Sequence, residues 1–126
     1  VMTDLIGVKT ADLVSEALGW AVGKAEGLNL ELVPPQYGNP WRVFARYQGQ
    51  AIEHTKRYNP WEDWALAGPL VLKHKLSIDP RRNAGTWGAY SDRWVNACKT
   101  PQIAVCLAVV IATLGHTVQV PKELMP

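Results

Sequence analysis

The sequence predicts an α+β fold: one small layered domain, residues 1–126, whose mixed or mainly antiparallel sheet is packed by two main helices and a shorter kinked helix. Three observations lead to this. The 126 residues fit the usual size of one domain. Residues 11–26 and 101–114 carry helix start and stop signals. The segments between them alternate apolar and polar residues over short stretches, as strands do. Their connections are too short and irregular for regular βαβ units.

The first predicted helix covers residues 11–26. Thr10 is placed to cap it, since a threonine hydroxyl accepts a bond from an orphaned backbone N–H. Lys24 lies in the last turn, where its charge complements the helix dipole. Gly27 supplies the left-handed residue that ends helices at little cost. Apolar residues recur at steps of three and four, which predicts a broad face packed on the core.

Two strands are expected next. Residues 28–33 alternate between leucine and other residues, as in a half-buried strand, and Pro34 and Pro35 end it because neither can donate to a sheet. A second strand is predicted over 42–47. The segment 48–58 is polar and charged, and we interpret it as an exposed connection.

The kinked helix is expected in two pieces, 60–67 and 69–74. Asn59 is predicted as its cap and Pro60 as its first residue. Pro69 removes one helical hydrogen bond and crowds the carbonyl four residues earlier, so we expect a kink or a restart there.

Short strands are predicted over 76–78, 86–90 and 117–120. The first two are joined by 79–85, a run rich in turn-forming residues.

The last helix, 101–114, has the clearest signals. Thr100 caps it, Pro101 takes its first position and Gly115 ends it. It is apolar on nearly all sides, which predicts burial. The uncharged stretch from Ile103 to Gly115 is well short of the ~20 residues that cross a bilayer, so no membrane role is expected.

Composition excludes several functional classes. Hydrophobic residues make up 48% of the chain, as in ordinary globular proteins. The net charge of +2 is too small for a dedicated nucleic-acid binder. Two cysteines do not form a disulfide framework, so we expect reduced thiols and a cytoplasmic protein. No apolar signal segment precedes residue 12.

Motifs for chemistry are missing from the sequence. There is no phosphate-binding loop, no dinucleotide fingerprint, no zinc-protease helix and no paired CxxC. The histidines 54, 74 and 116 have no metal-site spacing to each other or to the cysteines. Cys98 lies near a helix start and Cys106 within an apolar helix, so a thiolate with His116 as base is weakly supported. We assign no catalytic residue, metal site or cofactor.

Six tryptophans are the least ordinary feature. Trp61 and Trp64 are three residues apart and would share a helix face beside Asp63. Tryptophan joins a large apolar area to an N–H donor, so these three residues form the candidate contact surface. The competing interpretation is that this face packs on the sheet. Arg81 and Arg82 are a candidate phosphate or nucleic-acid contact, with a solvated loop as the structural alternative.

Three blocks of the chain carry a family resemblance. They are residues 8–27 (VKTADL through ALGWAVGKAEG), 58–70 (YNPWEDWALAGPL) and 100–124 (TPQIA through LG and VQVPKEL). In this order they resemble the NinX-like phage proteins. The segments 34–57 and 79–95 depart from that pattern. Gly19 stands where the family often has Asp, and His116 replaces a second Asp.

The resemblance implies a small accessory protein of phages and prophages, acting in the bacterial cytoplasm, with no site residues to carry over. Our leading hypothesis is a non-enzymatic protein that binds a phage or host macromolecule, with a homodimer as one arrangement. The alternatives are a small hydrolase or nuclease, and a weak nucleic-acid-binding module using Arg42, Arg46, Arg81 and Arg82.

Overall fold

The computed structural model describes residues 4–48, 53–91 and 93–125. It confirms a small α+β fold. The helices are α1 (Ser15–Ala25), α2 (Trp64–His74) and α3 (Pro101–Leu114). The strands are β1 (Leu5–Lys9), β2 (Asn29–Val33), β3 (Arg42–Gln48), β4 (Glu53–Arg57), β5 (Ser77–Arg81), β6 (Thr86–Tyr90), β7 (Trp94–Cys98) and β8 (Thr117–Pro121). Short 3-10 turns cover Thr10–Asp12 and Lys122–Leu124.

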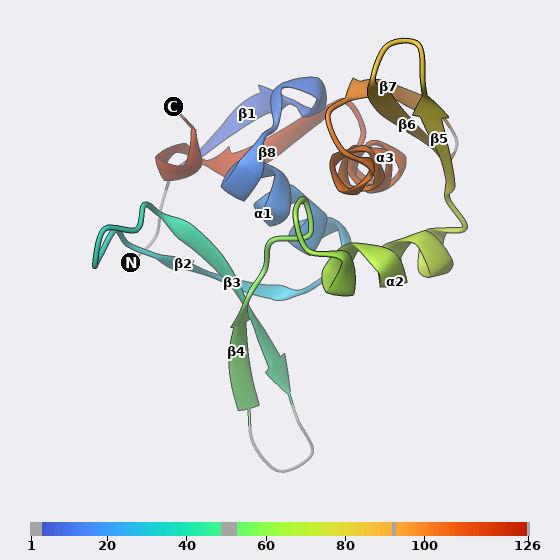
Figure 1. The fold of residues 1–126 in the computed structure, drawn as a ribbon. Helices are drawn as coiled ribbons and strands as arrows, with labels where there is room; N and C mark the ends of the chain where they lie inside the picture. Colours follow the sequence, from blue (N-terminus) through green and yellow to red (C-terminus); the bar gives the residue numbers. More distant parts are fainter. Residues whose placement is uncertain (1–3, 49–52, 92, 126) are drawn as a thin grey trace.

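All strand pairing is antiparallel, but the described strands form three small sheets rather than one. Their orders are β1–β8, β2–β3–β4 and β5–β6–β7. The first joins the two ends of the chain, with Val8 opposite Val118. The β3–β4 hairpin projects from the body, as Figure 1 shows. A β-bulge between Trp87 and Ala89 shifts the register of β6 against β7.

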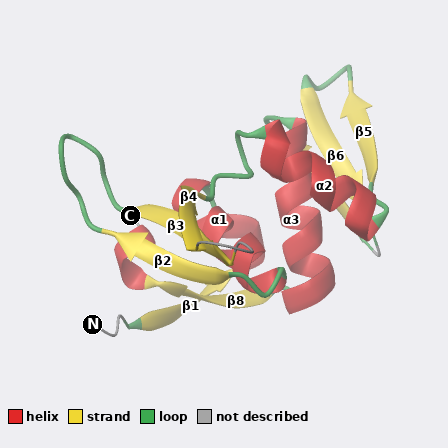
Figure 2. Cartoon of the chain, turned by 90° about the horizontal axis from the view of Figure 1, so that it is seen from below, coloured by secondary structure: helices red, strands yellow, loops and turns green. Residues whose placement is uncertain are grey.

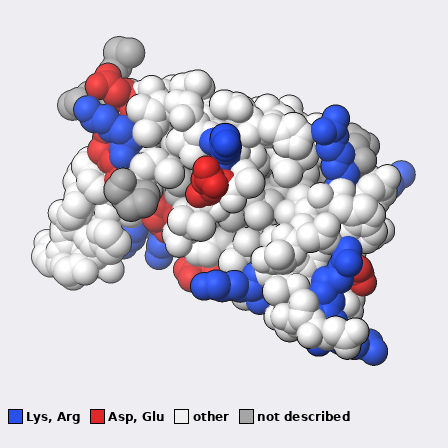
Figure 3. All heavy atoms as spheres, turned by 90° about the horizontal axis from the view of Figure 1, so that it is seen from above, with Lys and Arg blue, Asp and Glu red and all other residues white. Residues whose placement is uncertain are grey.

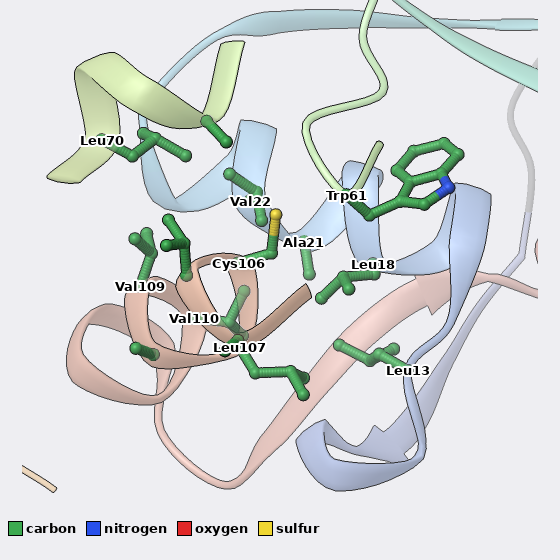
Figure 4. Close-up of a cluster of buried hydrophobic side chains, with 14 of the residues drawn as sticks. Leu13, Leu18, Ala21, Val22, Trp61, Leu70, Cys106, Leu107, Val109 and Val110 are labelled. Atoms are coloured by element: carbon green, nitrogen blue, oxygen red, sulfur yellow. The ribbon is translucent and has the colours of Figure 1, made fainter. Parts of the chain in front are cut away.

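Helix α3 forms the centre of the core. Thr100 accepts a hydrogen bond from the Ile103 N–H at 3.2 Å, which confirms the predicted cap, and Gly115 ends the helix with φ of 88°. Every residue from Ala104 to Val110 is buried. Figure 4 shows these side chains meeting those of α1 and α2. No helix of the described residues is long and apolar enough to cross a membrane.

Helix α1 begins later than predicted. Residues 10–12 form a 3-10 turn, and the α-helix starts at Ser15 with no side-chain cap. The buried Thr10 donates its hydroxyl hydrogen to the Gly115 carbonyl at 2.7 Å, so it is not the cap. This bond joins the 3-10 turn before α1 to the residue that ends α3. Gly27 adopts the expected positive φ of 71°.

Helix α2 also begins later, at Trp64 rather than Pro60. Asp63 caps it by accepting a hydrogen bond from Ala65 N–H at 2.9 Å, while the Asn59 side chain instead donates to the Glu62 carboxylate at 2.9 Å. The helix continues through Pro69 without the predicted interruption. A residue before proline disfavours helix because its Cβ crowds the proline ring, and glycine 68 has no Cβ to do so.

Three strands were not predicted. β4 lies in the segment 48–58 expected to be a connection, and β1 and β7 had no predicted counterpart. β4 alternates polar and charged residues, so no apolar period marks it. β5 also extends to Arg81, which moves the predicted loop of 79–85 to a tight turn at residues 82–85.

Close packing fixes the segment before α2 on α1. A Cβ on Gly19 would lie 2.5 Å from Trp61 Cζ3 and 2.9 Å from the Tyr58 carbonyl oxygen. Figure 4 shows the Trp61 ring lying against α1. Gly19 therefore allows Trp61 to reach the helix, and the Asp frequent in the resembling proteins would not fit here without a shift of Trp61.

Replacing Thr10 by valine keeps the shape but removes the donor to the Gly115 carbonyl. We expect the free energy of unfolding to fall by about 1–3 kcal/mol, because the partly buried Gly115 carbonyl loses its hydrogen-bond donor. Urea denaturation measures this. The matched control is Thr113→Val, because the exposed Thr113 donates its hydroxyl hydrogen to the Val109 carbonyl of its own helix; it should change stability by no more than about 0.5 kcal/mol. Equal losses in both variants would contradict the assignment.

Candidate contact surface

The outer face of α2 is apolar and uncovered. Trp64, Gly68 and Leu72 recur every four residues, which places them on one side of the helix. Trp64 is 45% exposed and Leu72 is 82% exposed. In Figure 2, the view from below, α2 lies in front of α3 with no other element over it. We call Trp64, Ala65, Gly68, Pro69 and Leu72 the α2 face. An exposed stripe of this kind is unusual for a surface helix.

A pocket of about 290 Å³ adjoins the α2 face. It lies between α2, the end of α1 and strand β3. Its lining residues are Glu26, Leu28, Tyr47, Tyr58, Ala65, Leu66, Pro69, Leu70 and Lys73. Two of them, Ala65 and Pro69, also belong to the α2 face, so the pocket and the stripe are continuous. The lining is mostly apolar with a few polar groups, which is typical of a recognition pocket.

The Glu26 carboxylate joins two of the elements that line the pocket. Glu26 follows α1 and is 10% exposed; its Oε1 accepts from Lys73 Nζ at 3.0 Å and its Oε2 lies 2.8 Å from His74 Nε2. A negative charge at a helix C-terminus is unfavourable alone, but the Lys73 ammonium group and the hydrogen bond with His74 offset it. The contact therefore fixes the last turn of α2 against the last turn of α1.

Two tyrosines complete the pocket wall. Burial raises the pKa of Tyr58 far above its usual value, and the nearby Tyr47, Cys106 and Glu26 raise it further. Burial also raises the pKa of Tyr47, whose ring stacks on His54 at 5.6 Å. Both groups thus stay neutral at physiological pH. Tyr58 lines the pocket, where its neutral hydroxyl can act as a hydrogen-bond donor.

The three residues of the predicted contact surface have different positions. Trp64 is exposed at the start of α2 and Asp63 caps the helix. Trp61 is only 9% exposed, because it precedes the helix and packs against Gly19. Trp61 and Trp64 therefore do not share a helix face, and Trp64 alone of this pair is exposed to a partner.

The candidate arginines lie on two different sheets. Arg42 and Arg46 are on β3, where Arg46 pairs with Glu31 at 3.4 Å. Arg81 is the last residue of β5 and Arg82 lies in the exposed turn that follows. The structure thus brings Arg81 and Arg82 together but not with the β3 pair.

The reactive side chains do not converge in the described part of the chain. His54 stacks on Tyr47, His74 pairs with Glu26, and His116 lies 2.9 Å from Arg93. Both cysteines are buried and free. No group of three or more His, Cys, Asp and Glu placed to hold a metal occurs among residues 4–48, 53–91 and 93–125.

The comparisons with known proteins identify the family. The family model described as "Bacteriophage P22, NinX" matches residues 9–113 of the chain. The chain belongs to the NinX family. It is thus a phage-encoded accessory protein. No curated protein matches the chain. The matched region of this NinX protein includes α1, α2 and nearly all of α3, and with them the α2 face and its pocket.

The sequence does contain a signal for the α2 face, which the prediction of a kinked helix over 60–67 and 69–74 did not use. In α2 of this NinX protein, buried Ala67 and Leu70 form one apolar stripe, while exposed Trp64 and Leu72 belong to a second one. One apolar stripe is enough to pack a surface helix on its core, so a second stripe indicates a face that is left exposed. The pocket had no such signal, because Glu26 and Tyr47 come from segments distant in sequence.

Neither thiol of this NinX protein is expected to act as a nucleophile. Burial raises the pKa of Cys106 to about 12 and also raises the pKa of Cys98, so both stay protonated at neutral pH, where only the thiolate reacts. We expect no modification by a thiol reagent at pH 8 in the native protein and reaction of both thiols in denaturant. Rapid native reaction of either thiol, followed by mass spectrometry, would contradict this.

Proposed function

We propose that this NinX-family protein is a non-enzymatic binding protein that engages another phage or host protein through the α2 face and its pocket, in the cytoplasm of the bacterial host. The observation that carries the proposal is the exposed stripe from Trp64 to Leu72 beside an apolar pocket. Apolar patches of this kind, rimmed by polar residues, mark interaction sites. A tryptophan near a pocket is the usual anchor of such a site.

The chemistry of the face indicates an amphipathic helix as the occupant. Acidic Glu62 and Asp63 lie at the start of α2, and basic Lys73 and Lys75 lie at its end. A partner helix that carries its charges in the same order and packs antiparallel would meet both ends with opposite charge. Gly68 leaves the middle of the stripe low, so the partner backbone can approach closely. One apolar side chain of the partner would fill the pocket.

The geometry favours binding over the enzyme alternative. A hydrolase or nuclease needs a nucleophile or metal beside an acid or base in a cleft. The pocket offers Glu26, but its carboxylate oxygens are taken by Lys73 and His74. The described thiols lie in the core. What remains in the pocket is an apolar wall with the Tyr58 hydroxyl, which suits recognition.

A site-specific cross-link tests the proposal. A photoreactive residue at the exposed position Ala65 is introduced into the full chain, expressed in phage-infected host cells, and irradiated. We expect one defined second protein to be linked through an amphipathic helix, identified by mass spectrometry of the linked peptide. Leu72→Glu should abolish the product, because it places a charge on the stripe. Fractionation of the same cells is expected to place the protein in the cytoplasm.

The matched control is Tyr37→Glu, which alters a side chain that is 95% exposed in the loop between β2 and β3. This variant should retain the cross-link. Circular dichroism should show native folding for both variants, since exposed substitutions change stability by about 0.5 kcal/mol or less. A product linking two copies of this chain, no product, or a product that survives Leu72→Glu would each overturn the proposed partner.

A further inference from the structure

The β5–β6–β7 sheet has an inner and an outer side. α3 covers the inner side, where Ala89, Val95 and Cys98 are buried. The outer side, which we call the sheet face, carries Asp79, Arg81, Tyr90, Trp94 and Asn96. Figure 2 shows β5 and β6 at the end of the molecule beyond α2 and α3. Both aromatic side chains of this face are partly exposed.

Two of these side chains form an exposed aromatic pair. Tyr90 and Trp94 are directly opposite each other on β6 and β7. Their ring centroids are 5.1 Å apart with an interplanar angle of 39°. Trp94 is 48% exposed and Tyr90 is 39% exposed. A tryptophan half open to water, held by strand pairing, presents a ring surface at little entropic cost on binding.

Arg81 is held beside this pair. Its guanidinium lies 5.5 Å from the Trp94 ring centroid, its Nε is 2.9 Å from Asp79 Oδ2, and its Nη2 donates to Asn96 Oδ1 at 2.7 Å. Next to it Gly88 is buried: a Cβ there would lie 2.8 Å from the Val95 carbonyl oxygen and 3.0 Å from Asn96 Oδ1, so only glycine leaves room for Asn96 to bond Arg81.

The surroundings of the sheet face are basic. Residues 75–100 contain five Lys or Arg and two Asp or Glu, a net charge of +3, whereas the whole chain is +2. The positive charge of the protein is thus concentrated in this segment. Arg82, Arg93 and Lys99 are all exposed around the sheet. In Figure 3, basic side chains gather at the end of the molecule that β5–β7 occupy, with little acid among them.

We infer that the sheet face binds single-stranded nucleic acid. Unpaired bases stack on aromatic side chains and on guanidinium planes, and stacking does not require a given sequence. Tyr90 and Trp94 supply the rings, Arg81 over the Trp94 ring supplies a guanidinium, and the exposed Arg82 and Arg93 are available to meet phosphates. A duplex has no free base faces to offer, so single strands are preferred. This function is separate from the proposed protein contact, which uses α2.

Fluorescence anisotropy with a labelled oligothymidylate of about 12 nucleotides tests the inference at low ionic strength. We expect binding by the full chain, weaker binding of a duplex of the same length, and a log–log salt slope of about −1.4 to −2.1 for two or three phosphate contacts. Trp94→Ala should weaken binding about 5- to 150-fold, from the loss of one stacked base. Trp94→Phe keeps a ring and should restore most of the affinity.

The matched control is Trp64→Ala, which removes a tryptophan of similar exposure from the α2 face. It should leave the anisotropy titration unchanged. The inference is overturned by no binding of the wild-type chain, by equal losses in Trp64→Ala and Trp94→Ala, or by equal affinity for the single strand and the duplex, which would show binding by charge alone. Failure here leaves the α2 cross-link unaffected, since that experiment probes a different surface.

Discussion

Helix α3 has 14 residues and no charged side chain, so it must be covered on nearly every side. That requirement arranges the rest of the molecule: α1 and α2 pack on it, and β5–β7 close another side. The Thr10 bond to the Gly115 carbonyl holds the end of α3 beside the segment leading into α1. Elements used to cover one helix have their other sides free, and both proposed contact surfaces are such free sides, one on α2 and one on β5–β7.

Much of this arrangement could be predicted from local chemistry. The Thr100 cap and the Gly115 stop defined α3 because both signals act within a few residues. The errors arose where a distant partner competed for a local group. Thr10 has the chemistry of a helix cap, but its hydroxyl bonds a carbonyl 105 residues away. Polar β4 has no apolar period and depends on pairing with β3, which no local pattern reveals.

The candidate sites were predictable only in part. Trp61 and Trp64 have the same side chain three residues apart, yet one is buried and the other is open. The difference comes from Gly19, whose missing Cβ admits Trp61 to α1, and from the helix start at Asp63. Arg81 was identified as a candidate from the sequence, but Tyr90 and Trp94 join it only through the register of three strands. Long-range pairing creates the sheet face, and sequence spacing does not encode it, whereas the α2 face follows from spacing within one helix.

Native-state hydrogen exchange of α3 tests the central claim most directly. If α3 is the element that all others cover, the amides of residues 105–110 should exchange only through global unfolding, with the same free energy that urea denaturation gives. Amides of the β3–β4 hairpin, which projects from the body, should exchange through smaller openings. Exchange of the α3 amides at a lower free energy than the hairpin amides would contradict this account.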